Sequence, residues 1–333
     1  MSAQTKTRVG VVGAGNIASI AQLPTLVKRD DVELAALVSR RPDPGALMRR
    51  WGFGGAYATV EDMLAAEDLD AVFVLTPRSE HAHAVEAALR SGVDVFCEKP
   101  LAPSADEAER LADLADEHGR ILMVDFNRRY APVYVAGRET FGDVGAAFCI
   151  AQKNRPGSEY RATFENAIHM VDLLRWYCGG EAVDVSAHAA GEDLWQEDGT
   201  AAVIRFDTGS TGVLMAARTA GAWNEKLDAY GTGRSAEIRA PESVAITVDG
   251  VTTTRDLSSE AFGWATATET LGFAEAVHHF LDRLADRRQP LTNGRDAVAT
   301  QRLLERVLQS AGLPTGEQEG RQWESHATNT TRR

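Results

Sequence analysis

The feature that most constrains the fold is an alternation of short apolar runs with helical patterns through the first part of the chain. The runs are rich in Val, Leu and Ile and are apolar at nearly every position, which is typical of strands buried on both faces of a parallel sheet. They cover residues 8–12, 32–38, 71–75, 93–96 and 121–124. Strands and helices that alternate in this way predict a doubly wound α/β domain.

Helix starts between these runs are marked by capping residues. Ser104 is followed three residues later by Glu107, a capping box, and small or apolar residues then recur at helical spacing, which predicts a helix over 104–118. Thr59 with Asp62 is a weaker start of the same kind.

After residue 126 the pattern changes. Several strand-like runs follow one another without a helix between them, so the second sheet should be mostly antiparallel. The runs cover residues 146–153, 183–189, 201–206, 212–217 and 244–248, with a turn at 207–210. Two long helices close this part, and the second of them stops at Gly312.

Composition excludes several classes of protein. With 35 Lys plus Arg against 48 Asp plus Glu, the net charge is −13, which argues against nucleic acid or an anionic membrane as a partner. Three scattered cysteines indicate neither a disulfide framework nor a zinc site, and we expect no metal. With no signal-peptide pattern and no apolar stretch long enough to span a bilayer, we expect a soluble cytoplasmic protein.

A glycine-rich turn follows the first predicted strand. Gly13 permits a tight strand-to-helix turn, Gly15 lets backbone N–H groups approach a pyrophosphate, and Ala18 allows close packing of helix on strand. A plain glycine turn is the alternative, but the strand before it and the α/β alternation after it favour dinucleotide binding by 13–18, with Asn16 and Ile17 inside the turn.

The end of the second strand indicates which cofactor is bound. An NAD site usually carries an acid here for the ribose 2′-hydroxyl, whereas a 2′-phosphate calls for cations and small donors. This sequence has Ser39, Arg40 and Arg41 and no acid. A solvated basic turn would look the same, but the position favours NADP, with NAD as the alternative.

Polar residues also follow two later strands, at the edge where open α/β sheets bind ligands. Thr76 and Pro77, with His81 beyond them, follow the run at 71–75, and Glu98 and Lys99 follow the run at 93–96. Charged residues beside a buried strand are unexpected unless a ligand or partner receives them. Lys99 stands out because the chain has five lysines in all.

One helix in the second half carries two acids and an imidazole. Glu165, His169 and Asp172 are spaced i, i+4 and i+7, which places them on one helical face. Taken alone, this pattern is more often a helix with one polar face than a catalytic site.

In combination these motifs resemble the Gfo/Idh/MocA family, which includes glucose–fructose oxidoreductase, inositol dehydrogenase and the rhizopine-catabolism oxidoreductases. The resemblance runs from about residue 8 to residue 313 and rests on the glycine turn, Thr76-Pro77, Glu98-Lys99-Pro100, the segment 126–129 and His169-x-x-Asp172. It implies a Rossmann domain, a C-terminal α/β domain, and hydride transfer between a nicotinamide and a hydroxyl or carbonyl carbon of a sugar or cyclitol.

The resemblance also implies roles for single residues. Lys99, often followed by a cis proline in the family, would hydrogen-bond the reacting oxygen, and His169 would be the general acid/base. Glu165 stands where the family usually has Asp, so either Glu165 or His169 carries the proton. We further assign the cofactor site to include Asn127 and Arg128, and the substrate site to include Arg155, Glu165, Asp172, Lys99 and His169.

These assignments divide the chain into a dinucleotide-binding domain at 1–126, a substrate-binding and oligomerisation domain at 127–314, and a disordered tail at 315–333. The resemblance implies a homodimer or homotetramer formed through the open C-terminal sheet. Two other functions stay open: reduction of an imine or enamine on the same scaffold, and a cofactor-binding sensor without turnover. Retention of Lys99 and His169 favours catalysis.

Overall fold

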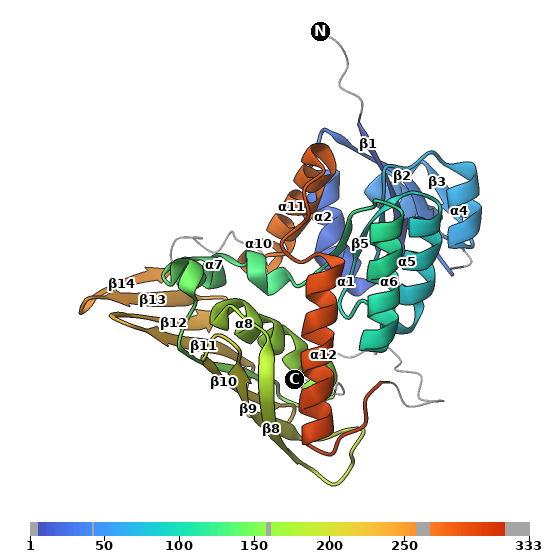
Figure 1. The fold of residues 1–333 in the computed structure, drawn as a ribbon. Helices are drawn as coiled ribbons and strands as arrows, with labels where there is room; N and C mark the ends of the chain where they lie inside the picture. The colour runs from blue at the N-terminus through green and yellow to red at the C-terminus, as the bar shows by residue number, and fades with distance from the viewer. Residues whose placement is uncertain (1–5, 42, 158–160, 258–266, 317–333) are drawn as a thin grey trace, which may run out of the picture.

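The computed structural model describes residues 6–41, 43–157, 161–257 and 267–316, and these form two sheets with helices around and between them (Figure 1). A six-stranded sheet has the order β3-β2-β1-β4-β5-β6, and an eight-stranded sheet has the order β14-β13-β12-β11-β7-β10-β9-β8. The predicted tail lies largely outside the described residues.

Every strand pair of the first sheet is parallel, which confirms the doubly wound prediction. The strand order reverses between β1 and β4, and that reversal opens the crevice in which such sheets bind dinucleotides. The strands are β1 (Thr7–Val12), β2 (Val32–Val38), β3 (Gly55–Tyr57), β4 (Ala71–Val74), β5 (Asp94–Cys97) and β6 (Leu122–Val124). The sequence did not predict β3, a half-buried edge strand.

Helices flank this sheet, and two of them have the N-caps that the sequence predicts. The side chain of Ser104 accepts a hydrogen bond from the Glu107 amide at 3.2 Å, and Thr59 accepts one from the Asp62 amide at 3.1 Å. The helices are α3 (Gly45–Trp51), α4 (Val60–Ala66), η1 (Arg78–Glu80), α5 (His81–Arg90) and α6 (Ala105–Glu117).

The helix that follows the glycine turn is interrupted. It consists of α1 (Asn16–Ile20) and α2 (Gln22–Val27). Pro24 has no amide hydrogen, so the carbonyl of Ile20 loses its partner within the helix. That carbonyl accepts a hydrogen bond from the Thr268 hydroxyl at 2.6 Å.

The second sheet is mostly antiparallel, as predicted; only β7 and β10 pair in parallel. The strands are β7 (Phe148–Asn154), β8 (Ala182–Ala190), β9 (Gly199–Phe206), β10 (Thr211–Ala217), β11 (Asn224–Gly231), β12 (Arg234–Ala240), β13 (Ser243–Val248) and β14 (Val251–Asp256). The turn at 207–210 joins β9 to β10, with Gly209 at a φ of 83°. The sequence analysis did not predict β11, β12 and β14, because these strands contain charged residues.

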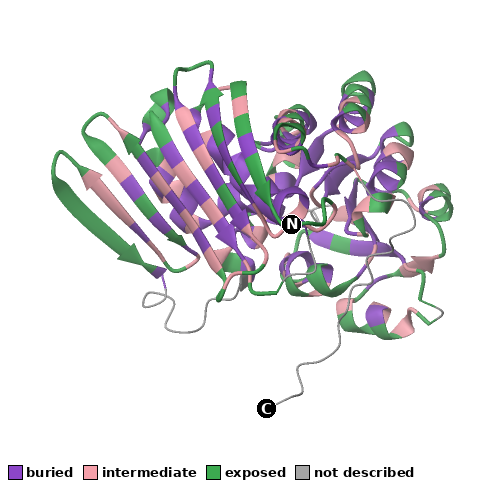
Figure 2. Cartoon of the chain, turned by 90° about the horizontal axis from the view of Figure 1, so that it is seen from below, coloured by how far each residue is buried: buried purple, intermediate pink, exposed green. Residues whose placement is uncertain are grey.

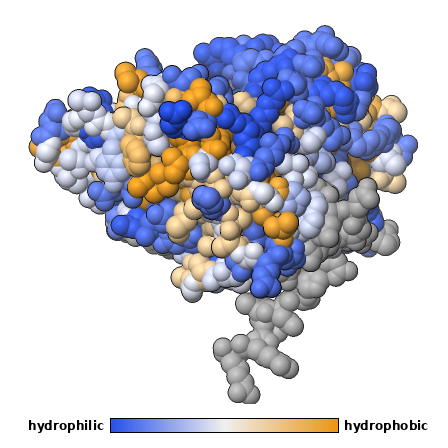
Figure 3. Space-filling view, turned by 60° about the horizontal axis from the view of Figure 1, so that its bottom comes forward, coloured by the Kyte–Doolittle hydropathy of each residue, from blue (hydrophilic) through white to orange (hydrophobic). Residues whose placement is uncertain are grey.

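Helices cover one face of this sheet and leave the other face bare, so buried and exposed residues alternate along the central strands (Figure 2). The covering elements are η2 (Asn127–Tyr130), α7 (Pro132–Glu139), η3 (Gly142–Val144), the π-helical segment η4 (Ala162–Ala167), α8 (Ile168–Cys178) and α12 (Gly294–Ser310). The bare face carries exposed apolar side chains, and Figure 3 shows apolar surface gathered on this side of the molecule.

The chain returns to the first sheet near its end. Helix α11 (Phe273–Asp286), preceded by α10 (Ala267–Thr270), places Phe280 with its ring centroid 5.4 Å from Phe73 and 5.5 Å from Phe96. Helix α11 belongs to the predicted second domain but packs with the first sheet, because its apolar face completes that sheet's core.

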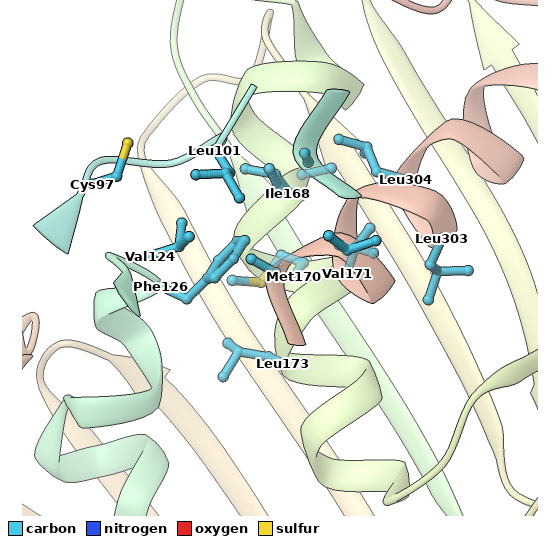
Figure 4. Close-up of a cluster of buried hydrophobic side chains, with 14 of the residues drawn as sticks. Cys97, Leu101, Val124, Phe126, Ile168, Met170, Val171, Leu173, Leu303 and Leu304 are labelled. Carbon is cyan, nitrogen blue, oxygen red and sulfur yellow. The ribbon is translucent and has the colours of Figure 1, made fainter. Parts of the chain in front are cut away.

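A single apolar cluster joins the two halves of the molecule (Figure 4). Leu101 and Phe126 come from the ends of β5 and β6, Ile168 and Val171 come from α8, and Leu304 comes from α12. This shared core fixes α8 against the strand ends of the first sheet, which is where the candidate site lies.

Candidate active site

The glycine turn has the geometry that a dinucleotide site needs. Gly13 has a φ of 88°, and a Cβ atom there would lie 2.9 Å from Cγ2 of Thr76. A Cβ at Gly15 would meet nothing within 4 Å, so open space faces the turn. Asn16 and Ile17 are exposed, whereas Ala18 is buried against the sheet. The turn can therefore accept a diphosphate.

The basic end of β2 has an acidic neighbour that the sequence analysis did not predict. Nη1 of Arg40 lies 2.6 Å from Oε1 of Glu80, and both side chains are exposed. The Ser39 hydroxyl accepts from the Arg41 amide at 3.2 Å. Exposed ion pairs contribute roughly 0–1 kcal/mol, so a phosphate could displace Glu80 from Arg40.

His81 is buried and bound at both ring nitrogens. Nδ1 lies 2.7 Å from the carbonyl oxygen of Pro100, and Nε2 lies 2.8 Å from that of Thr76. Burial lowers the pKa of His81, and the two carbonyls, which can only accept hydrogen bonds, oppose that effect. Both ring nitrogens face backbone carbonyls, which argues against the assignment of His81 to the cofactor. The ring instead connects the segments that follow β4 and β5. Thr76 and Pro77 are at least partly exposed.

Lys99 reaches from the first half of the molecule to the second. Its peptide bond to Pro100 is cis, as the resemblance implies, and its side chain is half-buried. Nζ donates to the backbone carbonyl of Glu165 at 3.4 Å. Burial lowers the pKa of Lys99, while the carboxylates of Glu98 and Glu165 oppose that effect.

Glu98 belongs to a group of buried polar side chains, and sequence analysis missed two of its members. Nε2 of Gln22 donates to Oε1 of Glu98 at 2.7 Å and to Oδ2 of Asp125 at 2.9 Å. Burial raises the pKa of both carboxyls, and the negative charge of Glu98 raises that of Asp125 further. Gln22 lies in a helix and Asp125 ends an apolar run, so neither belonged to a motif.

The helix that carries the two acids and the imidazole starts with a π-helical turn. Glu165 lies in η4, whereas His169 and Asp172 lie in α8. Glu165 accepts from the Arg161 amide at 2.5 Å and from the Arg78 guanidinium.

The carboxylate of Asp172 is engaged by other side chains of the protein, which argues against its assignment to the substrate. It is fully buried, and it accepts hydrogen bonds from Nε and Nη2 of Arg129 at 2.8 and 2.6 Å. The hydroxyl of Thr300 donates to Oδ1 at 3.0 Å. Both oxygens therefore hold α8 to η2 and α12, and neither is left to receive a substrate.

His169 faces a strongly positive environment. Its side chain is 7% exposed, and its Nδ1 has no hydrogen-bond partner among the described residues. Burial lowers its pKa well below the ordinary value, and the cations Lys153, Arg128, Lys99 and Arg155 lower it further. His169 is therefore neutral at pH 7 and suited to accept a proton.

A buried ion cluster lies beside His169. Glu225 accepts from Nε and Nη2 of Arg128 at 2.8 and 3.0 Å and from the Tyr134 hydroxyl at 3.0 Å, and Nζ of Lys153 lies 3.0 Å away. Glu225 holds Nε and Nη2 of Arg128, and the assignment of Arg128 to the cofactor stays a prediction. Lys153 is a charged residue at the end of the strand-like run 146–153, which is the one signal that could have singled it out.

The two remaining predicted residues are placed as follows. Asn127 donates through Nδ2 to the carbonyl of Leu271 at 2.8 Å, and its buried Oδ1 has no partner among the described residues. Arg155 follows β7, is half-buried, and adds to the positive surroundings of His169.

Comparison with known proteins identifies the family. Residues 7–126 match the oxidoreductase family with an NAD-binding Rossmann fold, and residues 141–237 match the GFO/IDH/MocA C-terminal domain. The chain belongs to the GFO/IDH/MocA family. The resemblance drawn from the motifs is thus confirmed, and with it an oxidoreductase family that acts on sugars or polyols.

Relatives within the GFO/IDH/MocA family match over most of their length. The chain is 30% identical to the oxidoreductase YceM of Salmonella typhimurium, over 91% of this chain and 98% of that one. It is 25% identical to inositol 2-dehydrogenase of Rhizobium meliloti, over 91% and 96% of the two chains. An oxidoreductase of Agrobacterium radiobacter, solved with NAD+, L-tartaric acid and magnesium, has the same fold, with a TM-score of 0.82, 21% identity, and coverage of 92% and 97%.

The described ranges hold neither a membrane-spanning helix nor a cluster of metal-ligating side chains. Across residues 6–41, 43–157, 161–257 and 267–316, no helix combines the length and apolarity that crossing a membrane requires. In the same ranges, no three His, Cys, Asp or Glu side chains gather as a metal site would require.

Proposed function

We propose that the protein transfers a hydride between NADP and a hydroxyl or carbonyl carbon of a sugar, cyclitol or related polyol. The observation that carries the proposal is the contact of Lys99, from the end of β5, with the backbone of Glu165, one helical turn before His169. A cation and a neutral imidazole thereby lie at the junction between the glycine-turn sheet and the second sheet.

The residues present fit a nicotinamide dinucleotide. The turn at 13–18 would hold the diphosphate, Ser39, Arg40 and Arg41 would hold a 2′-phosphate, and Thr76, Pro77 and Glu98 would lie toward the nicotinamide half. When bound, the cofactor supplies or accepts the hydride.

Side chains of the protein itself bind the substrate oxygen and accept its proton. Lys99 donates a hydrogen bond to the substrate oxygen and stabilises the negative charge that develops there. His169, neutral at pH 7, accepts the proton of a hydroxyl through a ring nitrogen, so its charge state favours oxidation of an alcohol. Glu165, held by Arg78 and by the Arg161 amide, positions the turn before His169.

The direct test is spectrophotometric. Purified protein is mixed with NADP+ and a panel of aldoses, cyclitols and sugar acids, and reduced nicotinamide is followed by its absorbance. Turnover of a polyhydroxylated substrate supports the proposal. Binding of NADPH with no turnover in either direction on the whole panel would instead support the sensor alternative, and turnover limited to cyclic imines would support imine reduction.

We predict that NADPH binds at least tenfold more tightly than NADH. Charge-assisted hydrogen bonds from Ser39, Arg40 and Arg41 to a 2′-phosphate contribute roughly 1.5–3 kcal/mol, which exceeds the exposed Arg40–Glu80 pair that the phosphate must displace. Fluorescence titration with both cofactors measures the ratio. Arg40→Ala should weaken NADPH and leave NADH unchanged; equal affinities in the wild type contradict the prediction.

We also propose that the bare face of the second sheet joins copies of the chain into a homodimer or homotetramer. Phe148, Val203 and Met215 are exposed there, on the adjacent strands β7, β9 and β10. Exposed apolar area of this kind marks an interaction surface.

We predict that Met215→Asp converts the oligomer to a monomer, because a carboxylate buried in an apolar interface would lack a partner. Light scattering after size-exclusion chromatography gives the mass. The matched control is Val27→Asp, at an apolar residue of similar exposure on α2, which should leave the mass unchanged. An unchanged mass for Met215→Asp, or a monomeric wild type, contradicts the proposed interface.

A further inference from the structure

Two carboxyls lie side by side at the ligand-binding edge of the first sheet. Glu98 follows β5, Asp125 follows β6, and these strands are neighbours. Gln22 of α2 joins them, since its Nε2 is 2.7 Å from Oε1 of Glu98 and 2.9 Å from Oδ2 of Asp125. Asp125 and Gln22 are fully buried, whereas Glu98 is half-buried, so Glu98 is the member of the pair open to the crevice.

The hydrogen-bond pattern favours a proton on this pair. The amide of Gln22 has two hydrogens, and it gives one to each carboxyl. Gln22 Oε1 and Asp125 Oδ1 are then both buried without a partner among the described residues. If Asp125 is ionised, both of these oxygens can only accept hydrogen bonds. A proton on Oδ1 of Asp125 makes that atom a hydrogen-bond donor. Burial, and the charge of Glu98, raise the pKa of Asp125 well above its ordinary value, which agrees with a retained proton.

The carboxyl pair lies at the strand ends that would hold the nicotinamide half of the cofactor. The glycine turn after β1 and the basic segment after β2 serve the adenosine half and the diphosphate. In a doubly wound sheet the second mononucleotide then lies over the ends of β4, β5 and β6. Glu98 and Asp125 follow two of these strands, next to Lys99. The charge that differs between the oxidised and reduced cofactor is on the nicotinamide ring.

We propose that Glu98, Gln22 and Asp125 form a proton-holding unit of the nicotinamide site, which releases its shared proton when the oxidised cofactor binds and keeps it when the reduced cofactor binds. The inference rests on the proposed function. The positive ring of the oxidised cofactor favours two ionised carboxylates, and the neutral ring of the reduced cofactor does not. The released proton goes to solvent, and no bond of the cofactor changes.

The other charged and titratable groups around the pair are accounted for by their own contacts. Burial keeps Cys97 and Tyr130 neutral, because it raises the pKa of each. Arg128 keeps its charge through Glu225. Helix α11, which packs on α2 and η2, directs His278 to Arg29 and places the His279 ring against Tyr130.

Lys99 is the neighbour that could give a similar signal. Burial lowers its pKa, so it too could lose a proton when a positive ring binds nearby. A variant of Asp125 separates the two sources, because it removes the carboxyl pair and leaves Lys99 in place.

The sign of the effect follows from linkage. A positive ring lowers the pKa of the pair, so the oxidised cofactor binds the deprotonated form more tightly. The ratio of the Kd for NADP+ to the Kd for NADPH therefore falls as pH rises through the titration of the pair. A pKa change of about one unit corresponds to about a tenfold change in this ratio. Titration of the 2′-phosphate is common to both cofactors and cancels in the ratio.

The experiment is fluorescence or calorimetric titration of NADP+ and NADPH between about pH 5.5 and about pH 9, a range chosen because an ordinary Asp, with a pKa of about 3.9, would show no change there. We expect the ratio to fall about tenfold in the wild type and to stay level in Asp125→Asn. The matched control, Asp113→Asn on the exposed side of α6, should behave as the wild type.

Calorimetry of the wild type in two buffers of different ionisation enthalpy counts protons without any variant. It should show more protons released by NADP+ than by NADPH. A level ratio in the wild type, equal proton release, or an unchanged pH dependence in Asp125→Asn each overturns the inference. Failure of the proposed function shows in other measurements: NADPH would bind without turnover on the whole substrate panel, or neither NADP(H) nor NAD(H) would bind.

Discussion

His169→Ala and Lys99→Met will each lower turnover by about 10²–10⁴-fold, the usual loss when a positioned acid/base or its oxygen-binding partner is removed. Cofactor affinity and the unfolding transition should stay close to those of the wild type. Nδ1 of His169 has no partner to lose among the described residues, and the Nζ of Lys99 loses one long hydrogen bond of 3.4 Å. Steady-state kinetics, cofactor titration and thermal unfolding measure the three quantities.

Matched controls come from residues of the same type on the second sheet. His188 is exposed on β8 and Lys226 is half-buried on β11, and His188→Ala and Lys226→Met should keep full activity. Glu165→Ala should lose less than His169→Ala, because Glu165 is bound by Arg78 and by the Arg161 amide. Near-full activity of His169→Ala would transfer the proton-carrying role to Glu165.

The pH profile supplies a second readout of the same assignment. His169 acts as a base in its neutral form, which predominates above its pKa. Burial and the surrounding cations lower that pKa well below the ordinary value of about 6.5. The acid limb of the kcat/KM profile for alcohol oxidation should therefore lie below pH 6.5. An acid limb at or above that pH would contradict this state of His169.

The sequence predicted those parts of the fold that have a strong local signal. Runs buried on both faces, as in β1, β2 and β4, are apolar at nearly every position, and caps such as Ser104 have a fixed spacing to their partners. Some strands with one face in solvent were missed: β12 alternates buried Ala236 and Ile238 with charged residues. The return of α11 to the first sheet depends on tertiary packing, which periodicity does not encode.

The candidate site was predictable at positions where the residue type has few alternative explanations. Gly13 needs its positive φ, and Lys99 follows a buried strand in a chain with few lysines. Spacing alone failed for Asp172, because an i, i+3 or i, i+4 relation does not show which partner occupies the carboxylate. Arg129 occupies it from a distant part of the chain, at 2.6 and 2.8 Å.

Glu225→Gln will destabilise the fold by about 3–5 kcal/mol, the usual cost of removing one partner from a buried ion pair. Glu225 is 2% exposed and receives four hydrogen-bonding or ionic contacts, from Arg128, Lys153 and Tyr134. Burial alone would raise its pKa, but Arg128 and Lys153 outweigh burial and hold the pKa far below its ordinary value. A neutral amide there would leave the buried Arg128 guanidinium and the buried Lys153 amine without an anion. Burial and Arg128 lower the pKa of Lys153, and Glu225 is the group that opposes them.

Chemical denaturation at pH 7 measures this loss, and Glu237→Gln on the solvent side of β12 is the control, expected within about 0.5 kcal/mol of the wild type. Adding Lys153→Met to Glu225→Gln should restore part of the stability, because one of the two unpaired cations is then absent. If Glu225→Gln alone stays within about 1 kcal/mol of the wild type, the cluster carries less charge than its contacts imply, and Lys153 is neutral in the folded protein. His169 would then owe its lowered pKa to burial and to Arg128, Lys99 and Arg155 alone.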